Sequence, residues 1–425
     1  MTPFRQYFRE HQRWFYLGML FLISCVNYLD RQTLSVLAPI LQEKLHFTAV
    51  EYSYIVTSFL VAYTIGYLIC AHVLDRIGVR TGLALALLLW SVADILHAFA
   101  YGWISLIFWR FLLGLAESFC NPAGVKVISD WVAPRERGFA MAIFSNGSVV
   151  GTMLAPPFIA ALALYFGWQW AFIVTGILGL PLAIVWLIYY REPNSHPHLS
   201  AAEKEYILEC KAPGIEDDTK MTVWDMLRNP LCLGFLIARF LTDSVSYFFG
   251  FWLPDYLVHS RGFSLTLIGI VAWLPYLVSA IGYQVGGSTS DILIRRGWQP
   301  SRARYALMLL AACLMPLSIL LFHTSFVTLA IGLIAVLLTA NACWMVNQLT
   351  LISESVSKRN VTTLLSLSAF SGSLGGILST LLIGHVVASF GYALIFYTLG
   401  GLHGIAMVVL LICRRWHNLS LKRVI

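Results

Sequence analysis

The feature that most constrains this chain is a series of apolar runs that are each long enough to cross a lipid bilayer. A transmembrane helix needs about 20 mostly apolar residues. The mean hydropathy of the chain is +0.76 and only 12% of its residues are charged, whereas a soluble domain carries about 25%. The sequence therefore predicts an all-α membrane protein with twelve transmembrane helices, near residues 14–38, 52–74, 80–100, 103–127, 138–164, 169–190, 231–257, 265–288, 303–322, 326–350, 361–388 and 391–413.

The distribution of positive charge predicts how these spans are oriented. Lys and Arg gather in alternate loops, such as Arg76 and Arg80 after the second span and Arg295 and Arg296 after the eighth. Because cytoplasmic loops carry the excess of Lys and Arg, both termini are expected on the cytoplasmic side of an inner or plasma membrane. The formal net charge of +7 then follows from topology and from attraction to anionic lipid. It does not indicate a nucleic-acid partner.

The two halves of the chain repeat each other. Asn146-Gly147-Ser148 in the fifth span corresponds to Ser371-Gly372-Ser373 in the eleventh. Six spans per repeat give both halves the same orientation, and parallel repeats with a site between them are the plan of a rocking transporter. A charged linker separates them, in which Ser200 to Glu203 reads as a capping box that opens a short amphipathic surface helix. The predicted parts are a first six-helix bundle, a cytoplasmic linker and a second six-helix bundle, at residues 1–190, 191–228 and 229–425.

Several motifs give the chain a family resemblance. The segment Asp75 to Arg80 resembles the signature between the second and third spans of the major facilitator superfamily. Four further segments resemble the anion:cation symporter branch of this superfamily. They are Asn27 to Ser35, Arg110 to Glu117, Trp131 to Arg137 and Arg239 to Tyr256. That branch takes up hexuronates, aldonates and related organic anions with protons. The resemblance implies the fold of this superfamily, a monomer in a bacterial inner membrane, and transport driven by the proton gradient without a cofactor.

The resemblance also assigns a conformational role to the loop motif. Asp75, Arg76 and Arg80 are expected to make contacts that stabilise one state of an alternating-access cycle. Asp291 is the corresponding acid after the eighth span.

Two arginines lie at a similar depth in the first and fourth spans. Arg31 is about eight residues from the outer end of its span and Arg110 about seven, which places both roughly 10–12 Å below the outer surface. A charged residue within a membrane is costly and usually faces a bundle interior or a watery cavity. Because a guanidinium grips a carboxylate through two parallel hydrogen bonds, we expect both arginines to contact an anionic substrate. The alternative is that each only neutralises a nearby acid.

Two acidic residues accompany these arginines. Glu117 shares one face of the fourth span with Arg110 and Gly114, and Asp30 adjoins Arg31. Burial favours the neutral form of a carboxyl group and a nearby arginine favours its charged form, so a carboxyl group under both influences can gain and lose a proton. The resemblance implies that acids at these two positions couple transport to protons. A static buried salt bridge is the alternative.

Recognition of sugar hydroxyls calls for further polar and aromatic side chains. Tyr28 lies three residues before Arg31 on the same side of the first span, and the resemblance adds Tyr63. The remaining candidates for substrate contact are Asn146, Ser148, Trp344, Asn347, Gln348, Ser371 and Ser373. For each Asn, Gln or Ser taken singly, a hydrogen bond between helices is the alternative.

Two other pairs are interpreted as structural. Arg239 and Asp243 lie four residues apart on the seventh span and can pair within one helix. Asp94 and His97 share a face of the third span, where packing or contact with water is the expected role. A proton relay through His97 is the alternative.

These features favour a transporter over other classes of protein. No nucleotide-binding loop, metal cluster or hydrolytic triad is recognisable, which argues against an enzyme. The predicted function is proton-coupled import of a small organic anion by alternating access, with a sugar acid such as a hexuronate, aldonate or aldarate as the expected cargo. An aromatic or dicarboxylic acid such as a phthalate-like compound is the alternative cargo. A non-transporting anion sensor is a more remote alternative.

Overall fold

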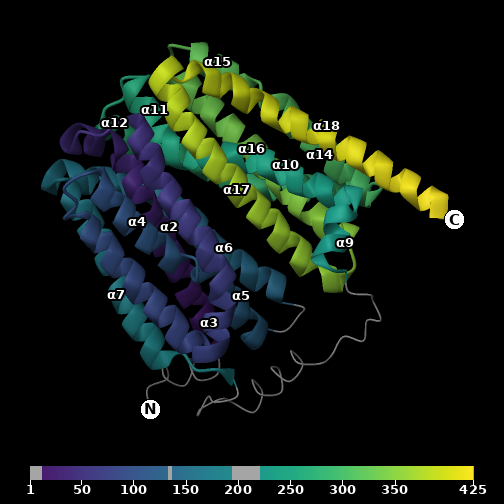
Figure 1. Ribbon diagram of the computed structural model, residues 1–425, viewed down its shortest axis with the longest axis horizontal. Helices are drawn as coiled ribbons and strands as arrows, with labels where there is room; N and C mark the ends of the chain where they lie inside the picture. The colour runs from purple at the N-terminus through teal and green to yellow at the C-terminus, as the bar shows by residue number, and fades with distance from the viewer. Residues whose placement is uncertain (1–11, 133–135, 194–220, 425) are drawn as a thin grey trace. The chain divides into compact units, whose positions relative to one another are not determined.

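The computed structural model describes residues 12–132, 136–193 and 221–424, and its regular elements there are all helices (Figure 1). Among these residues, eleven helical stretches are long and apolar enough to cross a bilayer. The remaining predicted span, the first one near 14–38, corresponds to α2 (Gln12–Leu45), whose 34 residues exceed the about 20 that a crossing needs. Its hydropathy is lowered by Asn27, Asp30 and Arg31. The prediction of an all-α membrane protein is confirmed, whereas the short helix expected at Ser200 lies outside the described residues.

Unit 1 takes its described residues from Met1–Phe47 and Tyr54–Ile215. Its helices are α2, most of α3 (Ala49–His97), α4 (Trp103–Glu117), α5 (Cys120–Trp131), α6 (Arg137–Phe166) and α7 (Trp168–Tyr189). Helix α2 packs along α6, beside which it lies in Figure 1, and also contacts α5 and α7. This central position explains why the polar side chains of Asn27 and Asp30 are buried.

Helix α3 consists of two spans joined at Gly78. The backbone there has φ 76° and ψ 156°, a conformation that glycine adopts readily and that a Cβ would strain. The helix therefore breaks between the predicted spans 52–74 and 80–100. In the loop motif around this break, Asp75 and Arg76 are exposed, and Arg80 Nε donates a hydrogen bond to the carbonyl oxygen of Leu187 at 2.8 Å.

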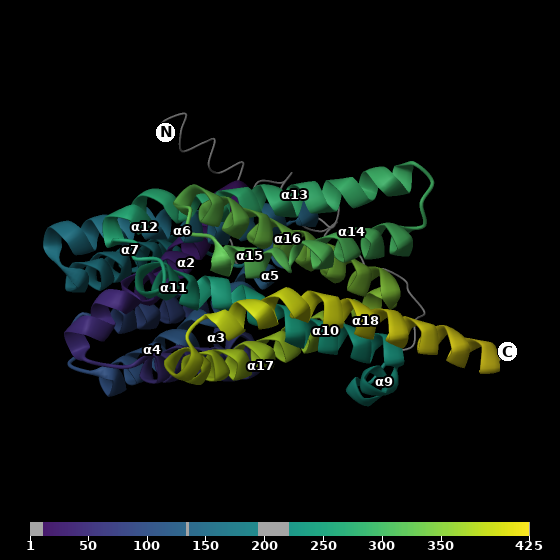
Figure 2. The same cartoon turned by 90° about the horizontal axis from the view of Figure 1, so that it is seen from above.

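Unit 2 takes its described residues from Thr48–Ser53 and Glu216–Ile425. Its helices are α9 (Val223–Arg228), α10 (Pro230–Tyr247), the π-helical turn η2 (Phe248–Trp252), α11 (Leu253–His259), α12 (Leu265–Val271), α13 (Trp273–Arg295), α14 (Pro300–Leu314), α15 (Leu317–His323), α16 (Val327–Ser355), α17 (Lys358–Phe390) and α18 (Ala393–Val424). Helix α10 packs against α17 and α18, and α13, α14 and α16 lie side by side (Figure 2).

Prolines account for most of the breaks within the spans of unit 2. Proline lacks a backbone N–H and clashes with the preceding turn of a helix. The π-helical turn η2 stands before Pro254, and α15 restarts directly after Pro316. Helix α13 begins at Trp273, so Pro275 falls in its first turn, where no intrahelical N–H bond is needed. Each of these spans therefore consists of consecutive helical segments.

Candidate functional site

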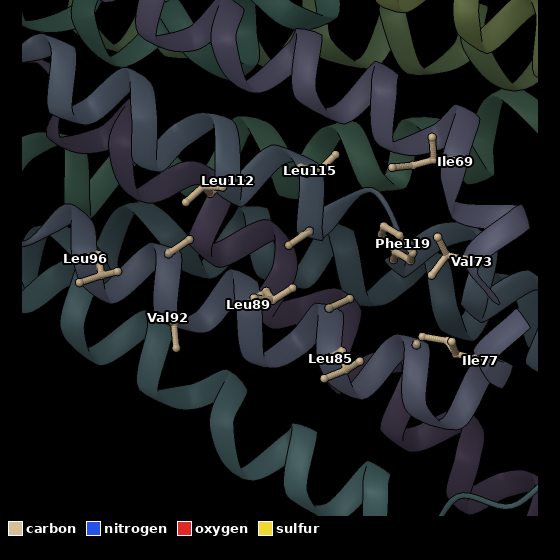
Figure 3. Close-up of a pocket in the computed structure, with 14 residues that line it drawn as sticks. Ile69, Val73, Ile77, Leu85, Leu89, Val92, Leu96, Leu112, Leu115 and Phe119 are labelled. Carbon is tan, nitrogen blue, oxygen red and sulfur yellow. The ribbon is translucent and has the colours of Figure 1, made fainter.

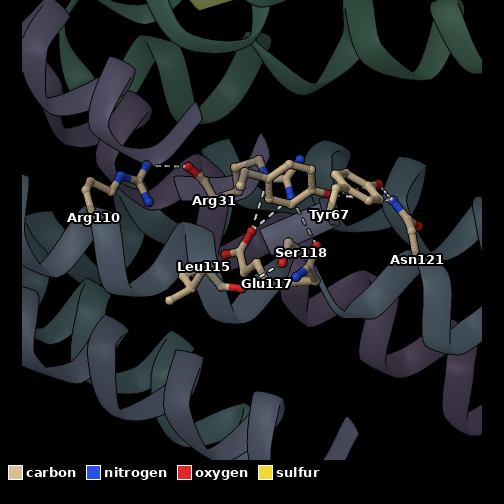
Figure 4. A network of polar contacts seen from close by, with 9 residues as sticks. Arg31, Tyr67, Arg110, Leu115, Glu117, Ser118 and Asn121 are labelled. Atoms are coloured by element: carbon tan, nitrogen blue, oxygen red, sulfur yellow. Dashed lines mark hydrogen bonds and ion pairs between the residues drawn. The ribbon is translucent and has the colours of Figure 1, made fainter. Parts of the chain in front are cut away.

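Several of the site residues predicted in the first half meet in unit 1, where α2, α3, α4 and α5 come together (Figure 4), namely Tyr28, Arg31, Tyr63, Arg110 and Glu117. Gly114 allows α4 to approach α3 closely. A Cβ at this position would lie 2.5 Å from the carbonyl oxygen of Phe59 and 3.1 Å from its Cα, so any larger residue would push the helices apart. Arg110, one turn before Gly114, lies with its guanidinium carbon 5.2 Å from the ring centroid of Phe59 on α3, and Glu117 lies one turn after Gly114 on the same face of α4.

An ion pair between α2 and α4 forms the centre of the site. Arg31 donates from Nη2 at 2.9 Å and from Nε at 3.1 Å, and both bonds reach the same oxygen, Oε2 of Glu117. The Arg31 side chain is 13% exposed and that of Glu117 is fully buried. The second oxygen, Oε1 of Glu117, is buried with no hydrogen-bond partner among the described residues. Two residues predicted separately, one to bind an anion and one to bind a proton, are therefore bonded to each other.

Aromatic rings surround the guanidinium of Arg31. Its central carbon lies 4.6 Å from the ring centroid of Tyr28, 4.7 Å from that of Tyr63 and 5.1 Å from that of Phe59. Such cation–π contacts are worth about 0.5–2 kcal/mol each. These rings hold the guanidinium in place while its Nε and Nη2 donate to Glu117. Tyr28 and Tyr63 were predicted as site residues, and Phe59 was not.

A hydroxyl and amide cluster continues from Tyr63 towards α5. Asn121 Nδ2 donates to the hydroxyl of Tyr67 at 3.1 Å and to that of Tyr63 at 3.4 Å. The two tyrosine hydroxyls lie 3.3 Å apart. The sequence reasoning did not identify Tyr67, although its spacing of four residues from Tyr63 places both on one face of α3. We name Tyr63, Tyr67 and Asn121 the hydroxyl cluster.

Two other charged residues predicted within the spans of unit 1, Arg110 and Asp30, lie close to this ion pair. Arg110 is fully buried, and its Nη2 donates to the backbone carbonyl oxygen of Arg31 at 2.8 Å. In this conformation Arg110 therefore links α4 to the backbone of α2. Asp30 is also fully buried, and neither of its carboxylate oxygens has a hydrogen-bond partner among the described residues. Arg110 and Glu117 are within electrostatic reach of Asp30.

The predicted polar contacts on α6 and α17 are partly accessible. Asn146 is exposed, and Ser148 Oγ donates within α6 to the carbonyl oxygen of Ser145 at 2.6 Å. On α17, Ser371 Oγ donates to the carbonyl oxygen of Leu236 on α10 at 2.9 Å. Ser373 is half-buried.

The predicted contacts on α16 lie in the interior of unit 2. Trp344, Asn347 and Gln348 are all fully buried. Trp344 Nε1 donates to Gln348 Oε1 at 3.0 Å, and Gln348 Nε2 donates to the carbonyl oxygen of Phe235 at 3.3 Å. Asn347 Nδ2 donates to the carbonyl oxygen of Gly286 at 3.3 Å. The bonds of Gln348 and Asn347 to backbone carbonyls link α16 to α10 and α13, and the sequence left such an interhelical role open as an alternative for both residues.

The predicted motif residue Asp291 takes part in a surface ion-pair network of unit 2. Arg304 Nη2 lies 3.0 Å from Asp291 Oδ1 and 3.2 Å from Glu354 Oε1. This network joins α13, α14 and α16. Sequence reasoning identified neither Arg304 nor Glu354.

A cavity of about 330 Å³ in unit 1 is unsuited to an anion (Figure 3). It lies between the two spans of α3 and α4, and all its lining residues are apolar, among them Ile69, Leu85, Leu89, Leu112 and Phe119. Such a lining offers a carboxylate neither charge nor hydrogen bonds, and the cost of removing a charge from water would stay uncompensated. The better candidate for anion binding is therefore Arg31 with the side chains around it, which we name the Arg31 network. Its other members are Glu117, Tyr28, Phe59 and the hydroxyl cluster.

Comparisons with known proteins identify the family of the chain. A family model described as Major Facilitator Superfamily matches residues 20–380. The chain is 32% identical over 392 residues to the hexuronate transporter of Escherichia coli (strain K12), covering 91% of this chain and 90% of that protein. It is 35% identical over 277 residues to the galacturonate transporter of Dickeya chrysanthemi, covering 65% and 80%.

Solved structures resemble the fold of the whole chain. A D-xylose–proton symporter has a TM-score of 0.73 at 15% identity, covering 93% of this chain and 96% of that one. An inward-facing, unoccupied bacterial homologue of the human lysosomal transporter Spinster has a TM-score of 0.72 at 19% identity, covering 96% of each chain. At these identities the likeness concerns the fold alone.

Proposed function

The chain belongs to the Major Facilitator Superfamily, and on that basis we propose that it imports a sugar acid together with protons. It is a multi-pass transporter of the bacterial inner membrane and not an enzyme. Relatives that match it are named for the transport of hexuronate and galacturonate. These cargoes share a carboxylate and several hydroxyls, and unit 1 offers Arg31 for the first and the hydroxyl cluster for the second.

The observation that carries the proposal is the geometry of the Arg31–Glu117 pair. The Nε and Nη2 groups of Arg31 both donate to one carboxylate oxygen of Glu117. The stronger bidentate arrangement, in which a guanidinium bonds to both oxygens of a carboxylate, is therefore not formed. A substrate carboxylate can present both of its oxygens to the guanidinium, and bidentate pairs of this kind are stronger and more specific. Substrate binding therefore displaces Glu117 from Arg31.

Displacement of Glu117 links the anion to a proton. A buried carboxylate that loses its partner costs several kcal/mol, and Glu117 is fully buried. When it takes a proton as the substrate arrives, the charge of the site stays the same, because one carboxylate replaces another at Arg31. The empty state with Arg31 and Glu117 paired and the state with anion and proton bound are both balanced, whereas the anion alone leaves a buried charge. Symport follows because only the balanced states complete the cycle by alternating access.

Asp30 supplies a second proton-binding group. It adjoins Arg31 on α2 and is fully buried without a hydrogen-bond partner among the described residues. An unpartnered buried carboxyl group is costly in its charged form, which suits a residue that gains and loses a proton during transport. Arg110 supports the site by holding the backbone of Arg31.

Polar groups around Arg31 would recognise the hydroxyls of the cargo. Tyr28 and the hydroxyl cluster lie next to the guanidinium, and Asn146, Ser148 and Ser373 are further proposed contacts. The hydrogen bonds of Trp344, Asn347, Gln348 and Ser371 support a role in holding unit 2 together. For Asp75, Arg76, Arg80 and Asp291 we retain the proposed conformational role.

Uptake into proteoliposomes tests the proposal. The purified full-length protein is reconstituted, and labelled galacturonate and galactonate are supplied with and without an inward proton gradient. We expect accumulation above equilibrium only with the gradient, and competition by other sugar acids but not by phthalate. Strong inhibition by phthalate alone would establish the aromatic or dicarboxylic cargo instead. Binding without accumulation under any gradient would establish an anion sensor.

A further inference from the structure

A second group of buried polar side chains lies in unit 1 outside the Arg31 network. Asp94 and His97 on α3 and Thr175 on α7 are fully buried. Figure 3 shows that the neighbouring Val92 and Leu96 belong to the lining of the apolar cavity, whereas Asp94 faces α7 and contacts Thr175. Among the described residues no salt bridge to Asp94 is formed, and its Oδ1 has no hydrogen-bond partner.

The contacts of Thr175 indicate where the hydrogen lies. Its Oγ1 is 2.6 Å from Asp94 Oδ2 and 2.8 Å from the carbonyl oxygen of Ala171. A hydroxyl has one hydrogen to donate, and a Thr in a helix commonly donates it to the carbonyl four residues back. A carbonyl oxygen cannot donate in return. When Thr175 donates to Ala171, the short contact with Asp94 is a hydrogen bond only if Asp94 carries the hydrogen.

His97 is not available as a positive partner for Asp94. Its Nδ1 lies 2.7 Å from the carbonyl oxygen of Ala93, and because a carbonyl only accepts, Nδ1 carries the hydrogen of that bond. Its Nε2 is buried with no partner among the described residues, and the ring stacks on Phe172 with centroids 5.1 Å apart. A second hydrogen on Nε2 would be a buried, unsatisfied donor on a charged ring, which is costly.

The charges of the region leave one carboxylate in surplus. Glu117 is paired with Arg31. Among the residues that the structure describes, Arg110 is then the arginine within electrostatic reach of both Asp30 and Asp94. An uncompensated buried charge costs several kcal/mol, and two nearby carboxyl groups that cannot both ionise share one proton between them.

We propose that Asp94 is a proton-binding residue of unit 1, which holds a proton while Asp30 supplies the negative charge that balances Arg110. Asp94 is the member of the pair with a hydroxyl acceptor for its hydrogen, since Thr175 lies at 2.6 Å. The titratable groups around the pair are Arg110, Glu117 and His97, together with Cys25 next to Asp30. The assignment concerns the protein without substrate and does not depend on which anion is carried.

Infrared spectroscopy of the full-length protein in liposomes tests this assignment. A protonated carboxyl group absorbs apart from an ionised one, and we expect such a band at neutral pH that Asp94→Asn removes. Glu43→Gln, which removes an exposed acid at the end of α2, is the matched control and should leave the band in place. Identical wild-type and Asp94→Asn spectra in this region would overturn the proposal.

Three further variants keep the test decisive if Asp94→Asn does not fold. Thr175→Val removes the acceptor and is expected to shift the acid band to higher frequency, whereas Thr175→Ser keeps the hydroxyl and the band position. An unshifted band in Thr175→Val would contradict the hydrogen bond from Asp94. Asp30→Asn is expected to weaken the band at neutral pH, because Asp94 then ionises to balance Arg110. A band that Asp30→Asn leaves unchanged would show that Asp30 and Asp94 do not share one negative charge, and would overturn the proposal.

Discussion

The first helix of each half carries an arginine with an acidic partner, and the two pairs are built differently. Arg31 on α2 reaches Glu117 on α4, which is 86 residues away in the chain. Arg239 on α10 reaches Asp243 one turn along the same helix, with Nε 2.7 Å from Oδ2. Both pairs are largely buried, with arginine side chains that are each 13% exposed.

The difference lies in what can separate the partners. A pair between two helices opens when the helices move apart or when a ligand takes the place of one partner. A pair within one helix travels with that helix and survives any rigid-body motion. Asp243 is also enclosed by α17, because a Cβ at Gly372 would clash with its carboxylate. We therefore assign the chemistry of transport to the pair in unit 1 and a structural role to the pair in unit 2.

The largest expected effect comes from Glu117→Gln. Glutamine cannot bind and release a proton, so accumulation driven by a proton gradient should be abolished, while counterflow exchange of the sugar acid persists at least in part. The measurement is labelled uptake in proteoliposomes in both modes. Asp243→Asn, the matched change in unit 2, should keep gradient-driven accumulation per folded molecule. Equal loss of both modes in Glu117→Gln would mean that Glu117 is structural as well.

The next largest effect is on stability, in unit 2. Asp243→Asn leaves the guanidinium of Arg239 buried without its counter-charge, which costs about 3 kcal/mol. Thermal unfolding in detergent should show a clear fall in Tm. The double variant Arg239→Gln with Asp243→Asn should recover much of that loss, because no lone charge remains. Losses that simply add would show that the two residues do not act as a pair.

Arg31→Lys should have a smaller effect that is confined to substrate affinity. Lysine keeps the charge but not the planar fork that grips a carboxylate, and a hydrogen bond to a charged group is worth about 1.5–3 kcal/mol. The Kd for the sugar acid should rise about 10- to 100-fold, since 1.4 kcal/mol is a factor of ten. Arg239→Lys is the control and should leave the Kd unchanged. An unchanged Kd in Arg31→Lys would remove Arg31 from the binding site.

Most of the fold could be predicted from the sequence, because the thickness of the bilayer sets the length of each span. The prediction of a span near 138–164, for example, corresponds to α6 at Arg137–Phe166. The breaks in the spans of unit 2 were not predicted, because hydropathy averages over the local backbone changes that proline imposes. The kink at Gly78 fell between two predicted spans and so agreed with them.

The site was predictable as a set of residues but not as a set of bonds. Charge inside a membrane singled out Arg31 and Glu117, yet their pairing depends on how α2 and α4, which are distant in the chain, lie beside each other in the fold. On α16 the limit is different. A polar residue such as Gln348 can serve a cavity or a neighbouring helix, and its spacing along the chain is the same in both cases. The position of Phe235 on α10 gives the amide nitrogen of Gln348 its acceptor, and that position cannot be read from the spacing of residues on α16.

Tyr67 is the tyrosine of the hydroxyl cluster that sequence reasoning overlooked, and Tyr67→Phe carries the smallest predicted effect. The change removes a neutral hydrogen bond from Asn121 Nδ2, seen at 3.1 Å, while the ring and the Arg31–Glu117 pair stay in place. The expected loss is about 0.5–1.5 kcal/mol, which is a rise of a few-fold in the Kd for a polyhydroxy acid. Affinity for a simple carboxylate without hydroxyls should not change, because Arg31 alone binds it. Equal weakening of both ligands would place Tyr67 in support of Arg31, whereas weakening of the sugar acid alone would extend the hydroxyl-recognition surface of unit 1 from α3 to α5.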